Sequence, residues 1–214
     1  MQRLMTPKEL KIFMDQLAKA YPNPQCELVW TNPFTLITAI ILSAQSTDKG
    51  VNKATPALFQ VADTPEKMLA LGLEGLVPYL KSLNYHNNKA KSLIALSTEL
   101  VQKFHGKLPT DIPTLETLPG IGHKTARVFV NVLCHAPVIG VDTHVLRLAN
   151  RLGFCHGDTP KEVEKKLEAL ITGPYKSKTA LALVLLGRYY CKAKKPLCAS
   201  CPVQSVCLSK EKTL

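Results

Sequence analysis

The chain has 214 residues, of which 46% are hydrophobic and 20% are charged, and its formal net charge is +11 at pH 7. This length suits one large domain or two small ones, and a mean hydropathy near zero excludes a disordered or a membrane-embedded chain. The positive charge favours a polyanionic partner such as nucleic acid, with simple solubility as the alternative.

The amino-terminal segment MQRLMTPKELKIF lacks the continuous apolar core of a signal peptide. We therefore expect a cytoplasmic protein, associated with the nucleoid if its partner is DNA. The longest apolar run, FTLITAIILSA at residues 34 to 44, is too short to span a bilayer and predicts a buried helix.

Helix-start signals recur along the chain, whereas strand-like alternation is nearly absent. TPKE at residues 6 to 9 has the form of a capping box with proline at the first helical position, and the same letters return at residues 159 to 162. The predicted class is all-α. The expected helices cover about residues 7–20, 33–45, 48–60, 65–71, 73–82, 87–104, 112–117, 123–134, 143–152, 160–171 and 177–190. PVIGV at residues 137 to 141 is expected to be an extended connector.

The stretch LPGIGHKT at residues 118 to 125 raises the question of a nucleotide-phosphate loop. Such a loop follows a strand and has four residues between its first glycine and an adjacent Gly-Lys pair. Here one residue separates Gly120 from Gly122, and Lys124 does not follow Gly122 directly. The pattern instead predicts a helix–hairpin–helix over about residues 112–134, with both glycines permitting positive φ. Amides at the start of its second helix would form an anion site suited to a DNA phosphate, with a plain packed hairpin as the alternative.

Lys124 falls in the first turn of this second helix, where the helix dipole disfavours another positive charge. Arg127 and Asn131 follow it by three and seven residues, so the three are expected to share a polar stripe on an otherwise buried helix. The placement favours an amine that loses its proton and acts as a nucleophile. A simple phosphate contact is the alternative.

Asp142 directly precedes an amphipathic stretch and is expected to cap that helix. Capping does not exclude function, because a capping carboxylate that faces a cleft can also shuttle protons or assist departure of a base.

Four of the seven cysteines lie close together at the carboxyl end, with the spacing C-x6-C-x2-C-x5-C. They are Cys191, Cys198, Cys201 and Cys207. Clustering of this kind indicates a metal site rather than disulfides, and the spacing leaves zinc and a cubane iron–sulfur cluster both open. The loop KAKKPL carries Lys192, Lys194 and Lys195, which ligation at both ends would fix for phosphate contacts.

Taken in this order, the motifs resemble those of the endonuclease III family. Its members are DNA glycosylases and abasic-site lyases of the helix–hairpin–helix superfamily. The likeness covers essentially the whole chain. It includes LSAQSTD at residues 42 to 48, LPGIGHKTA at 118 to 126, VDTHVLRLANR at 141 to 151 and GRYYC at 187 to 191.

The resemblance implies two all-α lobes with double-stranded DNA bound across the cleft. One is a six-helix barrel domain at residues 25–136, which contains the hairpin. The other combines residues 1–24 with 137–214, and its four cysteines hold a [4Fe–4S] cluster of structural role. We expect a monomer.

The resemblance also implies the chemistry. Neutral Lys124 attacks C1′ of a flipped, damaged nucleotide while Asp142 assists departure of the base. The resulting Schiff base acidifies the C2′ protons, and β-elimination cleaves the strand on the 3′ side. The substrates are oxidised or ring-saturated pyrimidines, such as thymine glycol, and abasic sites.

Further residues are expected to contact DNA. Gln45 would fill the space of the extruded nucleotide, and Tyr85 replaces the family's usual leucine wedge, so it would intercalate by stacking. His123 stands where arginine is common, which would make one phosphate contact weaker and dependent on pH. His144 is included, although a structural histidine is the simpler interpretation. The remaining expected contacts are Gly120, Gly122, Thr125, Lys192, Lys194 and Lys195.

Two other functions are compatible with parts of the pattern. A monofunctional adenine glycosylase shares the cysteine spacing, but it lacks the lysine nucleophile and has a longer chain. A non-catalytic DNA-binding module with structural zinc would need neither Lys124 nor Asp142.

Overall fold

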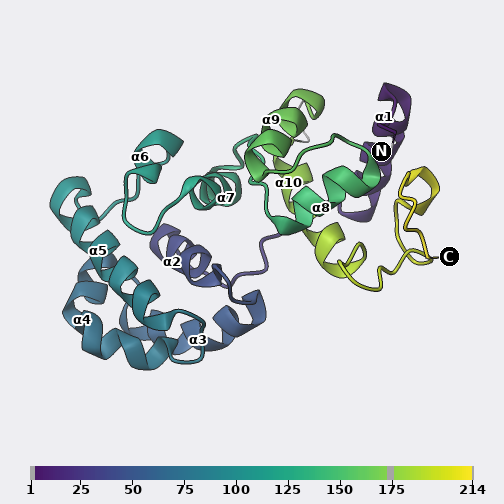
Figure 1. The fold of residues 1–214 in the computed structure, drawn as a ribbon. Helices are drawn as coiled ribbons and strands as arrows, with labels where there is room; N and C mark the ends of the chain where they lie inside the picture. Colours follow the sequence, from purple (N-terminus) through teal and green to yellow (C-terminus); the bar gives the residue numbers. More distant parts are fainter. Residues whose placement is uncertain (1–2, 173–175, 214) are drawn as a thin grey trace. The chain divides into compact units, whose positions relative to one another are not determined.

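The computed structural model describes residues 3–172 and 176–213, and every regular element within them is a helix (Figure 1). In chain order the elements are α1 (Pro7–Ala20), α2 (Pro33–Ser43), α3 (Asp48–Val61), α4 (Pro65–Leu80), α5 (His86–Phe104), α6 (Ile112–Glu116), α7 (His123–Cys134), α8 (Thr143–Leu152), α9 (Pro160–Leu170), α10 (Lys176–Tyr189) and the short 3-10 helix η1 (Gln204–Val206). The all-α prediction is confirmed, and PVIGV forms no strand.

Helix starts follow the capping signals of the sequence. At α1, Thr6 Oγ1 accepts the Glu9 N–H while the Glu9 carboxylate accepts the Thr6 N–H, which completes the capping box. At α9, Thr159 accepts the Glu162 N–H, but the Glu162 carboxylate accepts from Asp158. The second TPKE therefore caps its helix without the reciprocal bond.

The two helices predicted on either side of residue 72 form α4, which is kinked at Gly72. This glycine has φ 69° and ψ 172°, so the helical path is interrupted there. Because the left-handed region suits glycine, the kink falls where the sequence predicted the break. The second part ends at Leu80 rather than residue 82.

The chain divides into two compact units. The first, here called the hairpin unit, is Cys26–Cys134 and contains α2 to α7. The second, called the cysteine unit, combines Met1–Gln25 with His135–Leu214 and contains α1, α8, α9, α10 and η1.

Helix α2 forms the centre of the hairpin unit, as the apolar run predicted. Every residue from Phe34 to Leu42 is buried, and α3, α5 and α7 pack against the helix. Each large apolar side chain buried in this way contributes about 1.5 to 3 kcal/mol to the free energy of unfolding. The helix that follows the glycine turn is therefore fixed against the most buried element of the unit.

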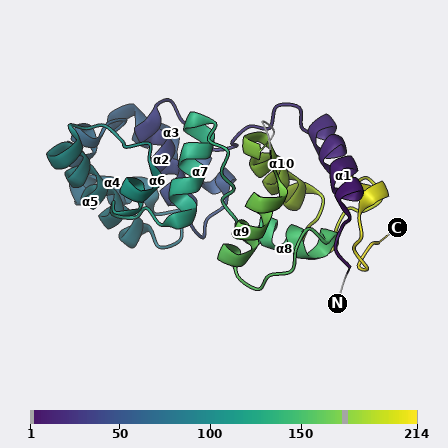
Figure 2. The ribbon, with the colours of Figure 1, turned by 90° about the horizontal axis from the view of Figure 1, so that it is seen from above.

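In the cysteine unit, the amino-terminal helix packs against carboxyl-terminal elements. Helix α1 contacts α10 and η1, and Figure 2 shows it beside the segment that contains η1. The rings of Phe13 and Phe154 meet edge to face with centroids 4.6 Å apart. Both ends of the chain thus contribute to one core. In the described residues, no helix combines the length and apolar character required to cross a membrane.

Candidate functional site

The turn between α6 and α7 requires glycine at Gly120 for two reasons. Its φ is +77°, a backbone conformation that side chains disfavour, and a Cβ built there would lie 3.0 Å from Ser92 Cβ and 3.7 Å from Ile41 Cδ1. Leu118 and Ile121 are buried on either side and anchor the turn in the core. Gly120 therefore brings the turn against α5.

Gly122 differs from Gly120, because only Gly120 adopts the positive φ that both glycines permit. A Cβ at Gly122 would meet no atom within 4 Å. The Gly122 carbonyl accepts the Ala126 N–H at 3.0 Å, so α7 begins at a residue that has no side chain of its own to cap the first-turn amides. Several other helices begin at a residue whose side chain does cap, as Thr47 does for α3 and Thr64 for α4. The residue at the start of α7 therefore lacks the side chain with which Thr47 and Thr64 cap their helices.

The first residues of α7 lie at the surface and the next polar residues do not. His123 and Lys124 are exposed and Thr125 is half-buried. Arg127 and Asn131 retain only 8% and 3% of their exposure, so beyond Lys124 the polar residues of the predicted stripe are buried. Their polar groups are buried with interactions of their own, and the amine at the helix start is the accessible one.

His123 is tied to the first helix of the hairpin. Its Nδ1 lies 2.7 Å from Oε1 of Glu116, the last residue of α6, and both side chains remain partly exposed. The carboxylate orients the imidazole across the turn and places a negative charge beside it. The sequence pattern did not single out Glu116, which lies seven residues before its partner.

Asp142 caps α8, as predicted. Its Oδ1 accepts the N–H groups of His144 at 2.8 Å and Val145 at 2.9 Å. Both capping bonds use the same carboxylate oxygen, and the side chain is half-buried. The helix start thus fixes the orientation of the carboxylate.

His144 lies one turn before an arginine on the same helix. Its Nδ1 is 3.2 Å from Nη2 of Arg147, and its Cβ and carbonyl oxygen pack close to Gly187 of α10. This is the environment of a histidine with a structural role, while its contact with DNA stays a prediction.

Gln45 and Tyr85 come from two loops that meet within the hairpin unit. Gln45 follows α2 and Tyr85 directly precedes α5, and both have left-handed backbone, with φ 52° and 56°. Asn84 Nδ2 donates to the Gln45 carbonyl oxygen at 2.8 Å. Both side chains are exposed, Tyr85 to 61%. Two residues predicted to enter the DNA stack therefore lie on adjoining loops.

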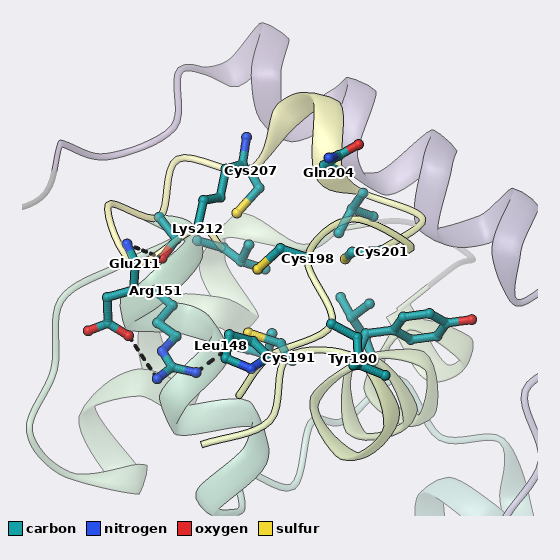
Figure 3. A pocket seen from close by; sticks show the side chains of 16 residues that line it. Leu148, Arg151, Tyr190, Cys191, Cys198, Cys201, Gln204, Cys207, Glu211 and Lys212 are labelled. Atoms are coloured by element: carbon teal, nitrogen blue, oxygen red, sulfur yellow. Dashed lines mark hydrogen bonds and ion pairs between the residues drawn. The ribbon is translucent and has the colours of Figure 1, made fainter. Parts of the chain in front are cut away.

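The four clustered cysteines line one pocket in the cysteine unit, and Figure 3 shows their sulfur atoms around it. They are Cys191, Cys198, Cys201 and Cys207. Within residues 3–172 and 176–213, no three His, Cys, Asp or Glu side chains form a group suited to one metal ion. A set of four soft sulfur donors around a shared space suits a multi-iron cluster, which each cysteine ligates through a different iron.

Burial raises the pKa of the Cys201 thiol and that of the Cys207 thiol. Cys191 and Cys198 raise both pKa values further by charge repulsion, and Cys207 raises that of Cys201, whereas Lys212 lowers the pKa of Cys207. Four thiolates together in this pocket would repel one another, so a cation that binds them compensates an unfavourable arrangement of charge.

Two arginines of α8 hold the cysteine segment, and sequence analysis did not identify either. Arg147 donates to the Gly187 and Cys191 carbonyl oxygens at 2.8 and 3.0 Å. Arg151 donates to the carbonyl oxygens of Lys192 and Ala193 at 2.7 and 3.1 Å. Their spacing of four residues, which places both on one helix face, is the signal that would have indicated a shared partner.

Arg151 also pairs with Glu211 near the carboxyl terminus, Nη2 to Oε2 at 2.8 Å (Figure 3). The three loop lysines Lys192, Lys194 and Lys195 are exposed. Because Arg151 binds the backbone of this loop at Lys192 and Ala193, its lysines project from an anchored segment.

Comparison with known proteins gives consistent matches. The model of the HhH-GPD superfamily of base excision DNA repair proteins matches residues 38–172. Endonuclease III of Treponema pallidum is 47% identical over 205 residues, which cover 96% of this chain and 97% of the relative. Endonuclease III of Escherichia coli is 42% identical over 205 residues, which cover 96% of this chain and 97% of the relative.

Solved structures agree with these matches. A trapped endonuclease III–DNA covalent intermediate in an estranged-adenine complex superposes with a TM-score of 0.89 at 42% identity, and covers 95% of this chain and 96% of that one. A thermostable thymine-DNA glycosylase has the same fold, with a TM-score of 0.80 at 20% identity, and covers 94% of this chain and 95% of that one.

Proposed function

Since the chain belongs to the endonuclease III family of base excision DNA repair proteins, we propose that Lys124 is its catalytic nucleophile. The enzyme is a bifunctional DNA glycosylase and abasic-site lyase. The observation that carries the assignment is an exposed primary amine one residue inside α7, a helix that begins at a glycine. Backbone amides at that start bind the phosphate and set the register, so that the amine meets the adjacent sugar.

The Lys124 amine, in its neutral form, forms a bond to C1′ of the damaged nucleotide while the glycosidic bond breaks and the base departs with its electron pair. Asp142 assists departure of the base and the proton transfers that follow. The capping bonds to Oδ1 hold its carboxylate in a fixed orientation, which supports this role. The C1′–O4′ bond then breaks and O4′ takes a proton, which leaves a Schiff base between Lys124 and C1′. Loss of a C2′ proton from this Schiff base expels the 3′ phosphate by β-elimination, and water later releases Lys124.

The family resemblance implies a [4Fe–4S] cluster, and we propose that the four cysteines of the pocket hold it. When bound, the cluster supplies structural cross-linking, because hydrolysis and elimination require no net electron transfer. Arg147 and Arg151 hold the backbone at Cys191 and after it, which keeps the ligands and the loop lysines in place. Lys192, Lys194 and Lys195 contact phosphates along the DNA.

The lesions we propose are oxidised pyrimidines in double-stranded DNA, together with abasic sites. Gln45 and Tyr85 enter the stack when the nucleotide leaves it, and Tyr85 stacks on bases where a leucine would wedge between them. His123 adds a phosphate contact in competition with Glu116. Because its substrate is double-stranded DNA, the enzyme would act at the nucleoid.

Borohydride trapping tests the nucleophile. Wild-type protein incubated with a thymine-glycol duplex and sodium borohydride is expected to form a covalent protein–DNA adduct, and Lys124→Gln is expected to form none. Lys103→Gln is the matched control, because Lys103 is an exposed lysine of the same unit that pairs with Glu99 along its own helix. Equal trapping by Lys124→Gln contradicts the assignment. Failure of the wild type to trap would favour a monofunctional glycosylase or a DNA-binding module.

Absorbance near ~400 nm tests the metal, since iron–sulfur clusters absorb there and zinc, with a filled d shell, does not. We expect the band in the purified protein and its loss when any two of the four cysteines are replaced by serine. A colourless protein with bound zinc would contradict the proposal.

A further inference from the structure

Two hydrogen bonds join the loop of Gln45 to the segment of Tyr85. Both are donated by side chains of the Tyr85 segment to atoms of the Gln45 loop. The first loop, residues 44–47, connects α2 to α3. The second segment is the turn before α5 together with the first turn of that helix, where Lys89 lies. The two residues that would enter the DNA stack both have positive φ, a conformation that residues other than glycine adopt only when their surroundings hold them there.

Asn84 makes the first link. This residue immediately precedes Tyr85, and its Nδ2 donates to the Gln45 carbonyl oxygen at 2.8 Å. The acceptor is the backbone of the strained residue itself, so the bond acts on the conformation of Gln45 directly. Asn84 is exposed and forms no part of the core.

Lys89, a buried residue in the first turn of α5, makes the second link. Its Nζ donates to Ser46 Oγ at 2.8 Å, while its backbone N–H donates to the Tyr85 carbonyl oxygen at 3.0 Å. One residue therefore contacts both loops, Ser46 beside Gln45 and Tyr85 itself. The residue is only 6% exposed, and burial lowers the pKa of its amine. A lysine buried in this way is unfavourable for stability, which points to another reason for its presence.

We propose that Asn84 and Lys89 are positioning residues that lock these two loops together, so that Gln45 and Tyr85 enter the duplex as one rigid unit. The proposal rests on the proposed roles of Gln45 and Tyr85 in DNA. The links hold both residues in their left-handed conformations before DNA arrives. The ordering of the loops is then already complete when the nucleotide is flipped, and the flipped state forms faster.

The first test is the rate of base release from a thymine-glycol duplex under single-turnover conditions. Asn84→Ala and Ser46→Ala each remove one link without removing a charge or a large side chain. We expect each to slow base release about tenfold, which corresponds to about 1.4 kcal/mol in the barrier. Asn88→Ala is the matched control, since Asn88 is an exposed asparagine of the same helix start. It is expected to stay within twofold of wild type.

The second test separates positioning from general destabilisation. If Asn84 acts through Gln45, its loss should matter little once the Gln45 side chain is absent. In a Gln45→Ala background, Asn84→Ala is therefore expected to slow base release by less than twofold. An equal tenfold loss in both backgrounds overturns the proposal.

Chemistry at the sugar provides the third measurement. Borohydride trapping on a single-stranded abasic oligonucleotide has no base stack to penetrate, so Asn84→Ala and Ser46→Ala should trap within twofold of wild type. A loss as large as on the duplex would locate the defect at the nucleophile and overturn the proposal.

The proposed DNA contacts and the proposed links between the loops are distinguished by different variants. If Gln45→Ala and Tyr85→Ala release base from the duplex as fast as wild type, the proposed DNA contacts are wrong, and the links have nothing to position. If those two variants are slow while Asn84→Ala and Ser46→Ala are not, only the linkage is wrong.

Discussion

Replacement of Gly120 by alanine tests the account of the hairpin turn, because two independent costs are expected there. The residue has φ +77°, and the new methyl group would lie 3.0 Å from Ser92 Cβ. Left-handed backbone costs an alanine about 1 to 2 kcal/mol. Two carbon atoms at this distance lie inside their optimal separation of about 3.5 to 4.0 Å, and overpacking of this kind costs about 1 to 3 kcal/mol.

Alanine also restricts the unfolded chain, which offsets about 0.4 to 1 kcal/mol of this cost. The free energy of unfolding of Gly120→Ala should therefore fall by about 3 kcal/mol, within a range of about 1 to 5. In a Ser92→Gly background the steric part disappears, so the same substitution should cost only about 1 kcal/mol, within a range of about 0 to 1.6. Urea unfolding of wild type, Gly120→Ala, Ser92→Gly and the double variant measures the cost of the alanine in both backgrounds.

Gly122→Ala is the matched control, because its φ is not positive and its methyl group would meet no atom within 4 Å. Alanine is a poor residue at a helix start, but its effect on the unfolded chain offsets this, so stability should stay within about 0.5 kcal/mol. Affinity for a duplex with a stable abasic-site analogue, measured by fluorescence anisotropy, should instead fall about tenfold, because the methyl group stands where the phosphate approaches the amides.

Opposite behaviour of the two glycines is the essential result. If Gly120→Ala unfolds within 0.5 kcal/mol of wild type, the positive φ and the Ser92 contact do not constrain the turn as argued. If Gly122→Ala binds the duplex as tightly as wild type, no phosphate approaches the start of α7.

Three further predictions concern the charged groups. Glu116→Gln removes a negative charge beside His123, so duplex affinity at low salt should rise about two- to threefold, and a loss would contradict the phosphate contact. Arg151→Gln removes two bonds to the loop backbone, and iron should pass to a chelator several times faster than from wild type. At α1, the pKa of Glu9 is lowered to about 2, first by its hydrogen bond from Arg3. Its contribution to stability is therefore complete above about pH 4.5 and is lost as the pH falls toward 2. When the pH is lowered from about 4.5 to 2, Glu9→Gln should accordingly lose less stability than wild type, as measured by thermal unfolding.

Helices and their starts were predictable because the signals are local. Thr6, Thr64 and Thr159 each stand before a proline, and the structure begins a helix at each of those prolines. The kink at Gly72 was predicted as a break between two helices for the same reason. The buried α2 required only a long apolar run.

Burial on α7 was not predictable from its own residues. Arg127 and Asn131 read as a continuation of the polar stripe of Lys124, yet the structure buries both. Helical periodicity gives the direction of a side chain about its own axis, and it says nothing about which neighbours cover that direction. The same limit applies to Glu116, whose partner lies across the turn.

Contacts between loops were equally invisible to local patterns. Asn84 and Gln45 lie 39 residues apart, and Lys89 and Ser46 lie 43 apart. Each motif could be recognised separately, because LSAQSTD and the loop before α5 resemble their family counterparts. Their pairing is a tertiary property that depends on how α2 and α5 pack.

Helix α8 joins two parts of the site that the sequence shows as unrelated motifs. Asp142 caps its first turn, and five and nine residues later Arg147 and Arg151 bind the backbone at Cys191 and after it. A displacement of the cysteine segment would therefore act on the same helix whose start orients the Asp142 carboxylate. Under the proposed ligation of the four cysteines, a structural role would act through this connection, because a fixed cysteine segment stabilises the helix whose start holds the carboxylate.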